Sequence, residues 1–211
     1  KVFMTYEGMA LSDMEMLKVM SVARETGAMV MVHAENYDAI RFLTDRLEQA
    51  GKTGTKYHGT SRPIAVEREA THRAIALAEL IDVPIMIVHV SNREAMEEIA
   101  RARRRGLKIY GETCPQYLML TEKDLEGLNM EGTKYVGAPP PRDEASQKAC
   151  WEGLQQGVFS LFEGTEFTGG GGTITLSARP CGDRVEVSVA DTGKGIPKDV
   201  QAHLFERFFQ A

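Results

Sequence analysis

The sequence has few cysteines and no long apolar run. Its three cysteines, Cys114, Cys150 and Cys181, lie far apart and show neither metal-binding nor disulfide spacing, so we expect free thiols. The longest apolar runs, AMVMV and VPIMIV, are far shorter than the ~20 residues that a membrane-spanning helix needs. These shortages exclude a disulfide-stabilised scaffold and a protein anchored by such a helix.

The sequence also lacks an excess of positive charge and a secretion signal. Its 25 Lys and Arg residues are outnumbered by 30 Asp and Glu residues, and the net charge of −5 gives no general attraction to nucleic acid. The one basic run, residues 101–105, directly precedes Gly106 and is typical of a helix C-terminus. We expect a cytoplasmic protein without nucleic-acid or membrane partners. The chain starts at Lys1 without a methionine, as expected of a fragment of a longer protein.

The first three quarters of the chain alternate segments of helical apolar spacing with short apolar runs. Helices are predicted over residues 12–27, 34–51, 64–82, 92–106 and 144–157, and strands over residues 1–6, 28–33, 83–90 and 107–114. Ser12 with Glu15 and Ser91 with Glu94 have the spacing of N-terminal capping boxes, and residues 52–63 are predicted to be a loop. Alternating helices and strands, the strands buried on both faces, predict an α/β fold with a parallel sheet, open or closed into a barrel.

Two histidines end predicted strands: His33 follows the run AMVMV, and His89 lies in VPIMIVHV. In β/α folds the carboxyl ends of parallel strands meet at one edge, where sites are built. Neutral imidazole there suits zinc, which lowers the pKa of a bound water molecule toward neutrality. The pair indicates a metal site, although a lone histidine at a strand end is more often a hydrogen-bonded core residue. His58, in the predicted loop, and His72, on a predicted helix, are interpreted as structural or solvated.

Several short segments indicate a protein family more specifically than the spacing of helices and strands does. They are KVFMTY, VHAEN, YHGTSRP, EREATHRAI, VHVSN, GETCPQYL and KYVGAPPPRD. In this order, over residues 1–162, they resemble the dihydropyrimidinase/hydantoinase family of cyclic amidohydrolases. The resemblance implies a TIM-barrel hydrolase, here a partial barrel, that opens a small cyclic amide such as a dihydropyrimidine or a hydantoin. It also implies that Lys1 is carbamylated and bridges two zinc ions, because a carbamate offers two anionic oxygens where a lysine amine is cationic. His33 and His89 match family zinc ligands, and Tyr6 matches the residue that hydrogen-bonds the oxyanion developing on the scissile amide.

Parts of the family's pattern have no counterpart in the sequence. The family's first two zinc ligands form an H-x-H motif that precedes the segment matching Lys1, and its last ligand is an aspartate that also serves as general base. After residue 162 the sequence has Glu163 and Glu166 instead, outside the family's phrase. Ala138 replaces the serine whose backbone contacts the substrate ring. We therefore expect no amide hydrolysis from a zinc site with half of its ligands.

The sequence pattern changes at Thr173. TITLSAR and RVEVSVAD alternate β-branched and polar residues around a turn, which predicts an antiparallel hairpin, and a glycine loop, DTGKGIP, precedes a last predicted helix. Residues 164–211 resemble the ATP-binding domain of sensor histidine kinases. The resemblance implies ATP and Mg²⁺ as ligands, with Asp191 accepting a hydrogen bond from the adenine amino group and Gly193 and Gly195 beside the base.

We interpret the sequence as a join of two unrelated fragments near Phe162 and Glu163. Residues 1–162 are predicted to be a hydantoinase-like barrel fragment, and residues 163–211 a histidine-kinase-type ATPase fragment with a small α+β fold. Phe159 and Glu163 replace the asparagines that hold magnesium in the kinase family.

Three hypotheses stay open for the function: a cyclic amide hydrolase, a nucleotide-binding module, and an inert fusion of two fragments. An open sheet of about four or five strands has exposed edges, so we also expect a homo-oligomer.

Overall fold

The computed structural model describes residues 1–126, 128–162, 174–181 and 184–191. The chain divides into two compact units, Lys1–Glu163 and Gly164–Ala211, and each is described by itself. No helix within the described ranges combines the length and the apolar character that a bilayer crossing requires.

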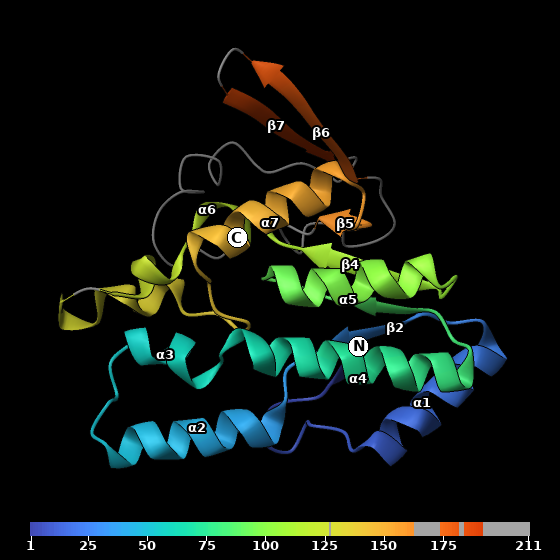
Figure 1. Cartoon of the computed structure of the whole chain (residues 1–211), viewed down its shortest axis with the longest axis horizontal. Helices are drawn as coiled ribbons and strands as arrows, with labels where there is room; N and C mark the ends of the chain where they lie inside the picture. Colours follow the sequence, from blue (N-terminus) through green and yellow to red (C-terminus); the bar gives the residue numbers. More distant parts are fainter. Residues whose placement is uncertain (127, 163–173, 182–183, 192–211) are drawn as a thin grey trace, which may run out of the picture. The chain divides into compact units, whose positions relative to one another are not determined.

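The first unit contains a five-stranded sheet with strand order β1-β2-β3-β4-β5, of which Figure 1 labels β2, β4 and β5. The strands are β1 (Val2–Phe3), β2 (Val30–His33), β3 (Ile85–Ile87), β4 (Ile109–Thr113) and β5 (Leu161–Phe162). The helices are α1 (Asp13–Thr26), α2 (Tyr37–Gln49), α3 (Lys56–Ser61), α4 (Ile64–Ile81), α5 (Arg93–Arg104), α6 (Pro115–Met119) and α7 (Glu144–Gln155), with the 3₁₀ turns η1 (Glu122–Leu125) and η2 (Leu128–Tyr135). All neighbouring strands pair in parallel, which confirms the predicted α/β fold with a parallel sheet.

The core of the first unit lies between this sheet and the helices that pack on it. Val32, Ile85 and Ile109, from three neighbouring strands, are all buried. β-branched side chains pack well on a pleated surface, which favours the extended conformation here. α4 runs beside α1 and α5 (Figure 1), and its buried Ala70 and Ala74 are small enough to let neighbouring elements approach closely. The packed helices therefore cover the buried side chains of the sheet.

The first predicted capping box is present, and the second is wrong. The Oγ atom of Ser12 accepts from the N–H of Glu15 at 3.4 Å, and the Glu15 carboxylate accepts from the N–H of Ser12 at 2.8 Å. α5 instead begins after Asn92, whose side chain accepts a backbone N–H of the first turn at 3.0 Å. Ser91 does not cap α5 because its hydroxyl donates to the carboxylate of Glu67, a distant contact that the local sequence does not reveal.

The predicted loop over residues 52–63 is wrong in part, because it contains α3 and so places His58 in a helix. This helix has no side-chain cap that a sequence pattern could show. Thr55 stands at its N-cap position, yet its Oγ1 atom donates to the carbonyl oxygen of Leu125 at 2.7 Å. A tertiary contact therefore stabilises the start of α3.

A buried ion-pair network joins three segments of the first unit. Arg142 donates from Nη2 to the Glu67 carboxylate and from Nε to Ser91 Oγ, each at 2.9 Å, and from Nη1 to the carbonyl oxygen of Arg62. The N–H of Ser91 donates to Glu67 at 2.9 Å. Glu67 and Arg142 are only 2% and 6% exposed, so these contacts replace water for both charges. The network ties the start of α4 to the turn after His89 and to the loop before α7.

Cys114 and Cys150 are buried and form no disulfide among the described residues, which confirms the prediction of thiols for these two residues. Burial raises the pKa of the Cys150 thiol to about 12. Because the thiolate is the reactive form, Cys150 is inert in the folded protein. Cys181 ends a strand of the second unit, and its side chain lies outside the described residues.

The second unit contains an antiparallel hairpin of β6 (Ile174–Cys181) and β7 (Arg184–Asp191). Ile174 pairs with Asp191, and Cys181 pairs with Arg184. This pairing confirms the hairpin predicted from the sequence. The glycine run, the DTGKGIP loop beyond Asp191 and the predicted last helix lie outside the described residues.

Candidate metal centre

His33 and His89 lie at the carboxyl ends of two neighbouring strands, at one edge of the parallel sheet. β2 ends at His33, and the pairing of Val32 with Ile87 of β3 places His89 one residue beyond the level of His33. Because parallel strands end at the same edge, residues 56 positions apart in the chain become neighbours.

The side chains at this edge form one aromatic group. The ring centroids of His33 and His89 are 4.4 Å apart with the planes at 69°. The ring of Tyr6 lies 5.1 Å from that of His33. Lys1 Nζ lies 5.6 Å from the centroid of the Phe3 ring, which is itself 5.6 Å from His33. The structure therefore gathers Lys1, Tyr6, His33 and His89, while their roles remain predictions.

The environment of His89 keeps its imidazole neutral. Burial lowers the pKa of His89 well below its ordinary value, and electrostatic interactions with His33 and Lys1 lower it further. The Nδ1 atom of His89 is buried and has no hydrogen-bond partner among the residues that the structure describes. An unsatisfied buried polar atom costs about 1–3 kcal/mol, and a neutral imidazole is the form that binds a metal ion. Both features suit a metal ligand.

Tyr6 and His89 also share an unusual backbone conformation, with φ values of 74° and 45° in the left-handed region. This conformation costs a non-glycine residue of the order of 1–3 kcal/mol and persists where the surroundings impose it. At His89 the surroundings are visible: its N–H donates to the Glu112 carboxylate at 2.9 Å, and the next N–H, of Val90, donates to the Glu112 carbonyl at 2.7 Å. β4 therefore holds the main chain that carries His89.

Tyr6 is suited to donate a hydrogen bond. Burial raises the pKa of its half-buried phenol and the nearby Glu35 raises it further, while Arg62 opposes them. The phenol therefore keeps its proton at neutral pH and can stabilise an oxygen on which negative charge develops.

Glu35 is a site residue that the sequence analysis missed. It follows His33 by two residues, is fully buried, and places Oε2 at 2.9 Å from Nε2 of His33. The sequence VHAEN carries no signal for this contact, because a glutamate is rarely buried unless it is paired, and its partner becomes visible only in the fold.

These residues supply a subset of the ligands of a metal ion. Protein zinc sites use three or four protein ligands. In the part of the chain that the structure describes, no group of three or more His, Cys, Asp or Glu side chains could hold a metal ion. His33 and His89 fit zinc in kind as imidazole donors, and Lys1 fits as a carbamate oxygen donor.

The other two histidines of the first unit have structural partners. His72 is exposed and pairs with Glu98 through Nδ1 at 2.9 Å, as expected of a solvated side chain. His58 Nε2 lies 2.7 Å from the carbonyl oxygen of Gly137, and its Nδ1 lies 3.3 Å from a guanidinium nitrogen of Arg62. Neither belongs to the group around His33.

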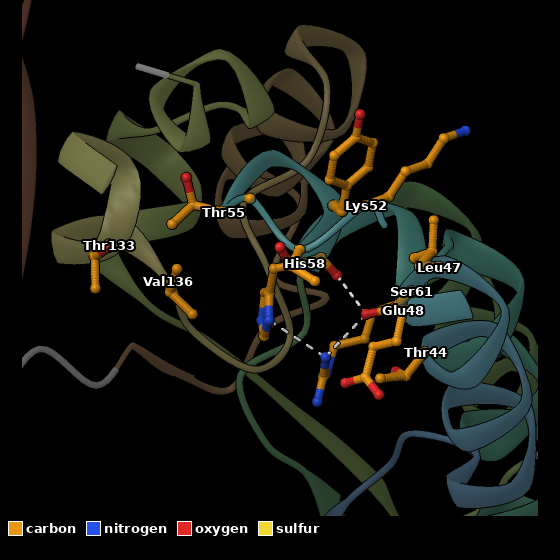
Figure 2. Close-up of a pocket in the computed structure, with 13 residues that line it drawn as sticks. Thr44, Leu47, Glu48, Lys52, Thr55, His58, Ser61, Thr133 and Val136 are labelled. Carbon is orange, nitrogen blue, oxygen red and sulfur yellow. Dashed lines mark hydrogen bonds between the residues drawn. The ribbon is translucent and has the colours of Figure 1, made fainter. Parts of the chain in front are cut away.

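A cavity of about 370 Å³ lies between α2, α3 and η2 (Figure 2). Its lining includes Thr44, Leu47 and Glu48 of α2, His58 and Ser61 of α3, and Thr133 of η2. Lys1, Tyr6, His33 and His89 do not line it, so this cavity is distinct from the candidate metal centre.

The remaining predicted site residues are not brought together by the structure. Ala138 lies in the segment between η2 and α7. Asp191 is the last residue of β7. Glu163, Glu166, Gly193 and Gly195 lie outside the described residues.

The first unit is similar to D-hydantoinases. The D-hydantoinase of Ralstonia pickettii is 49% identical over 160 residues, which are 75% of this chain and 35% of that protein. The D-hydantoinase of Rhizobium radiobacter is 47% identical over 174 residues, 78% of this chain and 38% of that protein. The crystal structure of a dihydropyrimidinase from Brevibacillus agri NCHU1002 matches with a TM-score of 0.76 at 43% identity, covering 77% of this chain and 36% of that one.

These matches show strong hydantoinase/dihydropyrimidinase homology over about 75% of the chain, and they confirm a fold related to the amidohydrolase barrels. The chain spans roughly a third of the length of the curated relatives it matches (35% of the first).

Residues 160–211 match the family model described as "Histidine kinase-, DNA gyrase B-, and HSP90-like ATPase". This match gives weak support to the predicted kinase-like fragment. The predicted join near Phe162 and Glu163 stays a prediction.

Proposed function

We propose that residues 1–162 are part of the barrel of a zinc-dependent cyclic amidohydrolase. The observation that carries the proposal is the contact between His33 and His89, with ring centroids 4.4 Å apart at the ends of neighbouring parallel strands, in a segment homologous to hydantoinases. His33 and His89 bind the metal through imidazole nitrogens. Lys1 binds it after its amine has reacted with carbon dioxide to form a carbamate.

The substrate is a small cyclic amide, a dihydropyrimidine or a hydantoin. Bound zinc supplies a water molecule of lowered pKa and polarises the amide carbonyl. The Tyr6 phenol donates a hydrogen bond to the carbonyl oxygen as negative charge develops on it. In a complete barrel, water would add to the amide carbon, the ring C–N bond would break and the nitrogen would take a proton, so that the product would carry a new carboxylate. Glu112 keeps His89 in place through its backbone N–H, at 2.9 Å.

We expect the 211-residue chain to bind zinc without opening the ring, since the described residues supply only part of the ligand set and the sequence lacks the aspartate that serves as general base in the family it resembles. Replacing Lys1 by alanine should weaken zinc binding in bicarbonate buffer by about 10-fold or more. Zinc titration measures the zinc affinity, and the ultraviolet absorbance of dihydrouracil and hydantoin measures ring opening.

The matched control is Lys1→Arg, which keeps the positive charge but cannot form the carbamate. It should behave like Lys1→Ala, and wild-type protein in carbonate-free buffer should approach both. Equal zinc affinity for all three proteins in bicarbonate would remove Lys1 from the site. Ring opening above the uncatalysed rate would contradict the expected inactivity.

We also propose that the chain assembles into a homo-oligomer, because β5 pairs only with β4 among the described strands and its other side can pair with another copy. A monodisperse monomer in sedimentation velocity would refute this. A cytoplasmic location remains a prediction from the sequence.

A second candidate function is nucleotide binding by residues 160–211, which the ATPase family match favours. Under this proposal the full chain binds a non-hydrolysable ATP analogue, and Asp191→Asn weakens binding because it alters the acceptor for the adenine amino group. Calorimetric titration measures both proteins. Absence of saturation at millimolar analogue, or equal affinity of the variant, would rule the proposal out.

A further inference from the structure

The contact between Glu35 and His33 is isolated from water. The Oε2 atom of Glu35 lies 2.9 Å from Nε2 of His33, and the two side chains are 0% and 3% exposed. The second carboxylate oxygen of Glu35, Oε1, is buried and has no hydrogen-bond partner within the described part of the chain. His33 is therefore the only side chain with a described hydrogen bond to this carboxylate, and no solvent competes for it.

The direction of the bond follows from the protonation of the two groups. An ionised carboxylate only accepts hydrogen bonds, so with Glu35 ionised Nε2 of His33 carries the hydrogen. In a neutral imidazole the other nitrogen, Nδ1, then keeps its lone pair. A histidine that binds a metal through one ring nitrogen commonly donates from the other to a carboxylate, which fixes both its tautomer and its ring orientation.

We infer that Glu35 is a positioning residue that holds His33 in the Nε2–H tautomer and so presents Nδ1 as the metal-binding nitrogen. The role toward a metal rests on the proposed function, whereas the tautomer is a property of the metal-free chain. Glu35 does not touch the substrate in this account. It acts through His33.

The tautomer can be read directly by nuclear magnetic resonance. In the metal-free full chain labelled with ¹⁵N-histidine, a long-range ¹H–¹⁵N spectrum distinguishes the two neutral forms and the doubly protonated ring, and His33→Gln assigns the signal. We expect the Nε2–H form for His33. In Glu35→Leu, which removes the acceptor while keeping an apolar side chain of similar size, both neutral forms should be populated.

A His33 signal of the Nδ1–H form or of the doubly protonated ring in wild-type protein would overturn the inference. So would an unchanged tautomer in Glu35→Leu. If that variant does not fold, the wild-type spectrum alone decides.

Cobalt(II) affinity tests the role toward the metal. Glu35→Leu should weaken binding by about 10- to 100-fold, and Glu35→Gln, whose amide oxygen can still accept from Nε2, should weaken it less. The matched control is Glu98→Gln, because Glu98 contacts His72 at the same 2.9 Å on an exposed surface. This control should leave cobalt affinity unchanged.

The two experiments fail separately. A wild-type chain that binds no cobalt contradicts the proposed function, while its tautomer still tests the contact between Glu35 and His33. Cobalt binding that is equal in wild-type protein and Glu35→Leu overturns the positioning role and leaves the proposed function standing.

Discussion

Replacing Glu67 by leucine is expected to lower the free energy of unfolding of the first unit by about 3–5 kcal/mol. The variant leaves the guanidinium of Arg142 buried without its carboxylate partner, which it now contacts at 2.9 Å. It also frees the hydroxyl and the N–H of Ser91, both of which donate to Glu67. Urea unfolding followed by tryptophan fluorescence measures the change, because Trp151 in α7 is the one tryptophan of the chain.

Two further variants separate this mechanism from a general loss of stability. Glu94→Leu removes an exposed pair with Arg68 and should cost no more than about 1 kcal/mol. The double variant Glu67→Leu with Arg142→Met removes both buried charges and should recover much of the lost stability. A double variant that is less stable than Glu67→Leu alone would contradict the assignment of the loss to an uncompensated charge.

The second large effect concerns the metal. His33→Ala and His89→Ala should each weaken cobalt(II) binding by at least about 100-fold, because each removes one imidazole ligand and a missing ligand costs no less than a missing partner of a ligand. Visible absorbance of bound cobalt during titration measures the affinity. His72→Ala is the matched control, since His72 is exposed and pairs only with Glu98 and Arg101 among described contacts.

The loss should be similar for the two variants, because the ring centroids of His33 and His89 lie 4.4 Å apart and belong to one site. If His72→Ala weakened cobalt binding as much as His33→Ala and His89→Ala do, cobalt would bind at the exposed surface and not at the proposed site. Wild-type affinity in His89→Ala would remove that residue from the ligand set.

The features that the sequence predicts correctly depend on local patterns. Buried apolar runs with helices between them indicate a parallel sheet, and strand-end positions bring His33 and His89 together. The start of α1 follows from the Ser12 and Glu15 spacing, which is complete within four residues. These signals need no knowledge of distant contacts.

The features that escape prediction depend on tertiary contacts. Ser91 has the spacing of a capping residue, but its hydroxyl donates a hydrogen bond to the carboxylate of Glu67 in another helix. Asn92 caps α5 instead. Glu35 looks like an ordinary polar residue after a strand until the fold buries it against His33. No local pattern distinguishes a buried glutamate from a solvated one, so its contact becomes visible only when the sheet and α4 are in place.

The most direct test of the proposed metal centre is X-ray absorption at the zinc edge of the zinc-loaded full chain. A metal site built on these ligands should show imidazole scattering from two histidines in the wild-type chain. The scattering should fall to that of one histidine in each of the single variants His89→Ala and His33→Ala. A spectrum without imidazole scattering, or one that neither substitution changes, would contradict a metal site built on His33 and His89.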